Sequence, residues 1–200
     1  MMSNKNNPGS FGSSRGLLNK IKKDKNRKSS STRWIGRQLS DPYVLEAQKR
    51  GYKSRAAFKL LQINDKFNFL LPGVSVIDLG CAPGGWLQIA AEKISSSTGN
   101  EKVIGVDILK TDDIAGCKSI VGDINDKEVG VHLIELLGQK PDVVLSDMAA
   151  NTTGHRQTDH MRTTHLLEIA LDFTIENLNS NGVFLAKCFK GGTEKEAFNL

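Results

Sequence analysis

One stretch of the sequence decides the fold: VSVIDLGCAPGGW, at residues 74–86. Its first part, Val74–Leu79, is a short apolar run of the kind that forms a buried strand. Its second part holds three glycines and a proline, and a helical pattern follows over Trp86–Ile94. A buried strand that runs through a glycine-rich turn into a helix is typical of the first unit of a parallel α/β sheet.

The same alternation of strand and helix patterns continues toward the C-terminus. Further strands are predicted at Val103–Val106, Ser119–Val121, Asp142–Ser146 and Gly182–Lys187, and helices at Lys127–Leu137 and Met161–Leu178. We therefore predict an α/β fold with a mostly parallel, doubly wound, Rossmann-like sheet that has helices on both faces. A last helical pattern covers Glu194–Phe198, so we expect the C-terminal strands of the sheet to lie beyond Leu200.

The N-terminal region differs in composition from the rest of the chain. Residues 1–33 contain nine Lys or Arg and one acidic residue, Asp24, with few large apolar groups. Such a segment is predicted to be a disordered basic extension, which either increases solubility or binds phosphates. Residues 34–200 are predicted to form one domain, whose first part, residues 34–70, contains two helices separated near Gly51.

Composition excludes several classes of protein. The chain has a net charge of +5 and a pI of about 9.1, which suggests an acidic partner. No run approaches the roughly 18 apolar residues of a membrane span, and the start lacks the pattern of a secretory signal. The cysteines and histidines lack the spacing of metal ligands, so we expect no metal site and a reduced, cytoplasmic location. These residues are Cys81, Cys117, Cys188, His132, His155, His160 and His165.

Acidic residues follow the predicted strands at the edge where such sheets bind ligands. We expect Asp107 to accept hydrogen bonds from ribose hydroxyls, Asp123 to accept one from the exocyclic amine of an adenine, and Asp147 to face the same cleft. The loop lacks the second glycine of a dinucleotide fingerprint, because Ala82 stands at that position. An adenosyl group with a small charged tail agrees better with this loop, and with Asp78 and Gly80 at its start.

Four motifs of the chain resemble the FtsJ/RrmJ family of ribose 2'-O-methyltransferases, at residues 54–60, 78–86, 146–151 and 186–189. Two positions depart from the family pattern, Cys81 and Ala150. The resemblance implies an S-adenosylmethionine-dependent methyltransferase fold. It also implies methylation of a uridine ribose 2'-hydroxyl in 23S ribosomal RNA of the large subunit, and hence a role in ribosome assembly.

The resemblance also implies roles for individual residues. Lys59, Asp147 and Lys187 match the family's catalytic positions, and a fourth catalytic residue, a Glu, is expected beyond Leu200. Cofactor contacts are implied for Gly84, Trp86, Asp107, Asp123 and Asp147. A loop with His155, Arg156 and His160 follows Asp147, and we expect that it could fold over the substrate.

The chemistry leaves the role of Lys187 open. Methyl transfer to a hydroxyl is an in-line displacement, so the enzyme must mainly hold the reacting atoms in line. A free lysine is protonated at neutral pH. Lys187 could therefore act as a base only if its surroundings remove the proton, or it could stay charged and stabilise the developing alkoxide. Lys59 could instead contact RNA phosphates.

Two other functions agree with the same residues. One is the same reaction on transfer RNA, and the other is a non-catalytic RNA-binding assembly factor that kept the fold. The basic N-terminal extension favours ribosomal RNA, and the presence of Lys59, Asp147 and Lys187 argues against the non-catalytic alternative. A monomer is the expected state.

Overall fold

The computed structural model describes residues 41–150 and 153–188. The chain divides into two units, residues 1–45 and 46–200. In the first unit the described residues begin helix α2 (Pro42–Arg50), where the Val44 amide donates to the Asp41 carbonyl at 3.0 Å. The predicted extension 1–33 and the helix predicted over Glu194–Phe198 lie outside the described residues. No described helix is long and apolar enough to cross a membrane.

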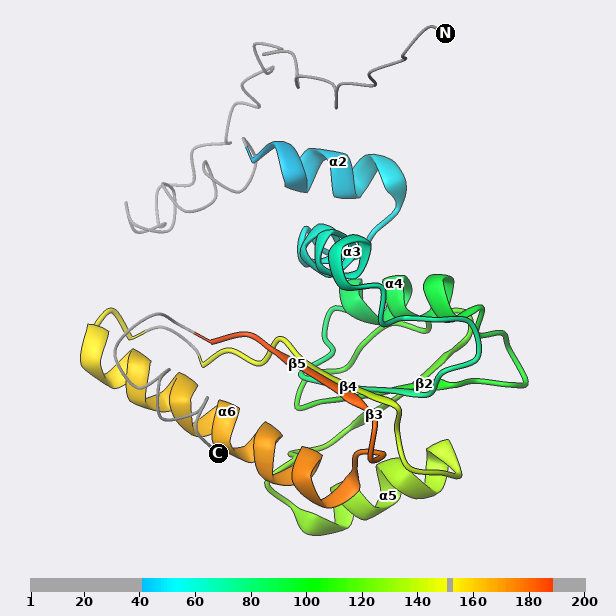
Figure 1. Cartoon of the computed structure of the whole chain (residues 1–200). Helices are drawn as coiled ribbons and strands as arrows, with labels where there is room; N and C mark the ends of the chain where they lie inside the picture. The colour runs from blue at the N-terminus through cyan, green and yellow to red at the C-terminus, as the bar shows by residue number, and fades with distance from the viewer. Residues whose placement is uncertain (1–40, 151–152, 189–200) are drawn as a thin grey trace, which may run out of the picture. The chain divides into compact units, whose positions relative to one another are not determined.

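The second unit is built on a sheet of five parallel strands, in the order β3-β2-β1-β4-β5 (Figure 1). The order reverses beside β1, which is where sheets of this kind bind ligands. This arrangement confirms the predicted doubly wound parallel sheet. The strands are β1 (Val76–Leu79), β2 (Val103–Asp107), β3 (Cys117–Val121), β4 (Val143–Ser146) and β5 (Val183–Ala186).

Helices cover both faces of this sheet. Helices α3 (Ala56–Phe67) and α4 (Gly85–Ile94) lie on one face, and α5 (Lys127–Leu137) and α6 (Arg156–Asn177) lie on the other (Figure 1). Because alternate strand residues point to opposite faces, β1 contributes to two apolar clusters. Val76 packs with α3 and α4, whereas Ile77 and Leu79 pack with α5 and α6.

Helix α6 begins at Arg156, well before the predicted start at Met161. Its first turns are polar, so apolar periodicity did not reveal them. The carboxylate of Asp159 holds this start in place, since it accepts hydrogen bonds from the Thr153 amide at 2.7 Å and from the Gly154 amide at 3.1 Å. The expectation that Arg156 and His160 lie in a loop is therefore wrong, because both belong to the helix. His155 is its N-cap residue.

Glycines allow the loops after the strands to approach one another closely. Gly80, directly after β1, has a φ of +78°, and a Cβ there would lie 3.0 Å from the Cα of Met148 in the loop after β4. At Gly105 in β2, a Cβ would lie 2.8 Å from the sulfur of Cys81. A side chain at either position would separate the loops that surround the sheet edge.

This close approach can be measured by comparing two glycines that share a left-handed backbone. Gly73 has a φ of +88°, but beyond its chain neighbours no described atom lies within 4 Å of where a Cβ would stand. We expect Gly73→Ala to cost about 1–2 kcal/mol from backbone strain alone. Gly80→Ala should cost more, because the Met148 backbone must also move. Urea unfolding checks this, and equal losses in the two variants would contradict the role of the close approach.

Candidate active site

A cavity of about 600 Å³ opens at the carboxyl ends of β1, β2, β3 and β4. It brings together four residues that the sequence predicted for the site: Gly80, Asp107, Asp123 and Asp147. Helix α6 adds one face with Arg162, His165 and Leu166, which the sequence analysis did not identify. They are spaced three and four residues apart, as residues on one helix face are. This spacing was the feature of the sequence that could have identified them. The rest of the lining is mainly apolar and includes Ile108, Ile124 and Met148.

Two of the lining carboxylates are held by backbone amides. Asp107 accepts from the Ala82 amide at 2.9 Å and from the Leu109 amide at 2.8 Å, so it ties the loop after β1 to the end of β2. Asp123 is exposed, and its Oδ1 accepts hydrogen bonds from the backbone amide and the side-chain amide of Asn125. A carboxylate oxygen has more than one lone pair, so both residues retain acceptor capacity toward a ligand.

The third lining carboxylate forms an ion pair. The Nζ of Lys187 lies 2.6 Å from Oδ1 of Asp147 and 2.8 Å from its backbone oxygen. The parallel pairing of β4 with β5 sets this contact, and the Lys187 amide also donates to the Ser146 carbonyl at 2.8 Å. An ammonium has three N–H groups. Two of them are directed at Asp147, which leaves a third for another acceptor.

Asp78 lies beneath the cavity and outside its lining. Its side chain is fully buried on β1, and no donor in the described part of the chain bonds to either carboxylate oxygen. Burial raises the pKa of Asp78 well above its ordinary value, and the nearby carboxylates of Asp147 and Asp107 raise it further. Burial, with Asp78 nearby, also raises the pKa of the Cys81 thiol to about 12.

The start of α4 is packed too tightly for side chains at its glycines. Gly84 has a φ of +107°, and a Cβ there would collide with the side chain of Ile114. At Gly85 a Cβ would collide with the hydroxyl of Ser54. The indole N–H of Trp86 donates to the Ala56 carbonyl at 2.9 Å, so this side chain is engaged with α3. A ligand at the loop could therefore meet the backbone of Gly84 and Trp86.

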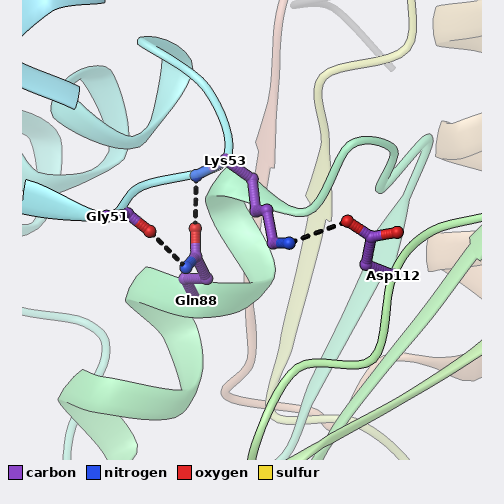
Figure 2. Close-up of polar contacts among 4 residues, drawn as sticks. All are labelled: Gly51, Lys53, Gln88 and Asp112. Atoms are coloured by element: carbon purple, nitrogen blue, oxygen red, sulfur yellow. Dashed lines mark hydrogen bonds and ion pairs between the residues drawn. The ribbon is translucent and has the colours of Figure 1, made fainter. Parts of the chain in front are cut away.

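Polar contacts also join the segment before α3 to helix α4 and to the segment between β2 and β3 (Figure 2). The side chain of Gln88 accepts from the Lys53 amide at 2.7 Å and donates to the Gly51 carbonyl at 3.0 Å. The Lys53 ammonium lies 2.8 Å from a carboxylate oxygen of Asp112. No sequence motif marks Gln88 or Asp112, because their partners lie far away along the chain.

Lys59 is exposed on α3. Among the described residues it forms no ion pair with Asp147, whose carboxylate is engaged by Lys187. The structure thus brings together two of the three predicted catalytic residues, and Lys59 stays a prediction.

The buried carboxyl of Asp78 has a consequence for stability. A carboxyl whose pKa is raised by folding destabilises the folded state as pH rises above the ordinary range of the unfolded chain. We expect Asp78→Asn to gain stability relative to the native protein as pH is raised from about 4, near the unfolded pKa, to neutral. Urea unfolding at a series of pH values measures this. The slope is the readout, because the amide adds a constant cost. A difference that does not change with pH would contradict the raised pKa.

Comparison with known proteins gives consistent matches. Residues 52–200 match the family model of FtsJ-like methyltransferases. A ribosomal RNA large subunit methyltransferase E of Mesorhizobium japonicum is 50% identical over 194 residues, 97% of this chain and 73% of that protein. A protein of the same name from Paramagnetospirillum magneticum is 52% identical over 189 residues, 94% of this chain and 78% of that protein.

A solved structure is also similar. It is a Plasmodium falciparum protein described as a ribosomal RNA methyltransferase, with 30% identity and a TM-score of 0.66. The similarity covers 74% of this chain and 84% of that one. The family match extends over both the glycine-rich loop and the Lys187–Asp147 pair.

Proposed function

Because this chain belongs to the family of FtsJ-like methyltransferases, we propose that it methylates a ribose 2'-hydroxyl of large-subunit ribosomal RNA with S-adenosylmethionine as donor. The target is a uridine of 23S ribosomal RNA. The observation that carries the proposal is the Lys187–Asp147 ion pair beside an acid-lined cavity at the switch point of the sheet. The expected cytoplasmic location and monomeric state stay predictions.

The residues of the cavity agree with an adenosyl ligand. Asp107 can accept hydrogen bonds from ribose hydroxyls, and Oδ2 of Asp123 can accept one from an exocyclic amine. Ile108 and Ile124 offer apolar surface to a flat base. Gly80, Gly84 and the backbone of Trp86 let the main chain approach the methionine part of the ligand. The carboxylate of Asp147 suits a neighbouring ammonium group.

S-adenosylmethionine supplies, when bound, an electrophilic methyl group on a positively charged sulfur. Lys187 then acts as a charged donor, held in place by its ion pair with Asp147. Its third N–H stabilises the negative charge that develops on the 2'-oxygen as the hydroxyl proton passes to solvent water. Asp147 orients this ammonium through two hydrogen bonds. Of the two roles that the sequence leaves open for Lys187, this proposal takes the charged stabiliser.

Substitutions of Lys187 test this mechanism. We expect Lys187→Met to lower methyl transfer by about 10²–10³-fold, as the loss of one charge-stabilising donor does. Lys187→Arg keeps a charge and should retain part of the rate, which a neutral base would not allow. The assay is transfer of tritiated methyl to unmodified large subunits, followed by mapping of the labelled nucleotide. Lys140→Met is the control, since Lys140 precedes β4 at the opposite edge of the sheet.

The outcomes separate the alternatives that the sequence leaves open. Label on transfer RNA alone would redirect the substrate assignment, and no label from a folded, cofactor-binding protein would favour an RNA-binding assembly role. Arg and Met variants that are equally inactive would argue against a charged stabiliser and for a neutral base.

The role of Lys59 can be determined by measuring separately how its substitution changes RNA binding and kcat. As an exposed cation on α3, it is proposed to contact an RNA phosphate or the reacting ribose. A phosphate contact predicts that Lys59→Met weakens RNA binding and lowers the slope of log K against log salt by about 1. A role at the reacting ribose predicts a fall in kcat with little change in that slope. Salt-dependent binding and steady-state kinetics of the one variant distinguish the two.

A further inference from the structure

One fully buried acid, Asp78, has no role in the proposed mechanism. Neither of its carboxylate oxygens has a hydrogen-bond donor among the described residues. Its strand neighbours are Gly105 on β2 and Leu145 on β4, each two residues before an acid at the sheet edge, Asp107 and Asp147. Asp78 thus lies one step along the sheet below two of the carboxylates that line the cavity.

The groups around Asp78 leave its charge uncompensated. Asp107 is held by two backbone amides, and Asp147 is held by Lys187. Burial raises the pKa of both nearby thiols, Cys81 and Cys117, to about 12, so they are neutral. The first turn of α4, which packs over this face, carries no charged side chain. The described site therefore holds four carboxyl groups, Asp78, Asp107, Asp123 and Asp147, against two cations, Lys187 and Arg162, an excess of two negative charges if all were ionised.

We propose that Asp78 makes the site selective for a sulfonium cofactor over its thioether product: it holds a proton in the empty site and releases that proton to solvent when the cation binds. The inference rests on the proposed function, because the cation is the sulfonium of S-adenosylmethionine. Only the O–H bond of Asp78 breaks. After methyl transfer the sulfur is neutral, so Asp78 takes a proton back from solvent. The electrostatic attraction that favoured the sulfonium is then absent, and the thioether product is bound more weakly.

This selectivity requires no direct contact with the ligand. In a low-dielectric interior, charges interact over longer distances than they do in water. A positive charge brought into the cavity therefore favours the ionised form of the carboxyl beneath it. Asp107 and Asp147 differ from Asp78 in that each already accepts hydrogen bonds from donors of the described structure.

Calorimetric titration tests the proposal with two probes, S-adenosylmethionine and S-adenosylhomocysteine. Measurements in buffers of different ionisation enthalpy count the protons released at each pH. For the native chain we expect release of up to one more proton with the sulfonium than with the thioether. Over the pH range in which binding releases that proton, the affinity for the sulfonium should rise by up to about tenfold per pH unit. Thioether affinity should change less.

Two variants assign the effect to Asp78. Asp78→Asn should lose the extra proton and reduce the preference for the sulfonium by about tenfold, one pKa unit of coupling, while it still binds the thioether. Asp172→Asn, which alters an exposed acid on α6, should behave like the native chain. If Asp78→Asn does not fold, equal proton release for the two probes in the native chain still overturns the proposal.

Each result has a defined meaning. Equal proton release for the two probes, or extra release that persists in Asp78→Asn, would overturn the role of Asp78 and leave the proposed function intact. Failure of both probes to bind the folded chain would overturn the proposed cofactor, and this inference with it.

Discussion

The close approach of the loops that follow β1, β2 and β4 is the constraint on which the rest of the structure depends. Gly80 lets the loop after β1 lie against Met148, and Gly105 makes room for Cys81. Asp107 then binds the Ala82 amide and holds that loop in place. Without these contacts, the strand-end acids would be parts of separate loops. With them, they become the lining of one cavity.

Electrostatics at this edge of the sheet combine compensated and uncompensated charges. Asp147 accepts a hydrogen bond from the ammonium of Lys187, and Asp107 accepts two from backbone amides. Asp78 has no such donor in the described structure and is fully buried. Methyl transfer from a sulfonium removes a positive charge from the site. In the proposed function, one acid without a compensating donor would therefore make the site bind the sulfonium and its thioether product with different strength.

The helical segment before β1 is tied to the same region by polar contacts. Gln88 on α4 holds the backbone at Gly51 and Lys53, and Lys53 reaches Asp112 in the segment between β2 and β3 (Figure 2). The indole of Trp86 binds the first residue of α3. The exposed cations of α3 are thus carried on a helix whose start is anchored to the glycine-rich loop.

Residues 74–86 and the apolar runs after them determined the parallel sheet, because strand and helix periods are local properties of the chain. The motifs around Asp147 and Lys187 also indicated the kind of site. The start of α6 at Arg156 was missed, since its anchor is a carboxylate and not an apolar pattern. Only tertiary structure decided that Lys187 pairs with Asp147, that Gln88 and Asp112 anchor Lys53, and that Asp78 has no donor among the described residues. Each of these features depends on groups that folding brings together from distant parts of the chain. Burial and hydrogen bonding are set by these tertiary contacts and not by the local sequence.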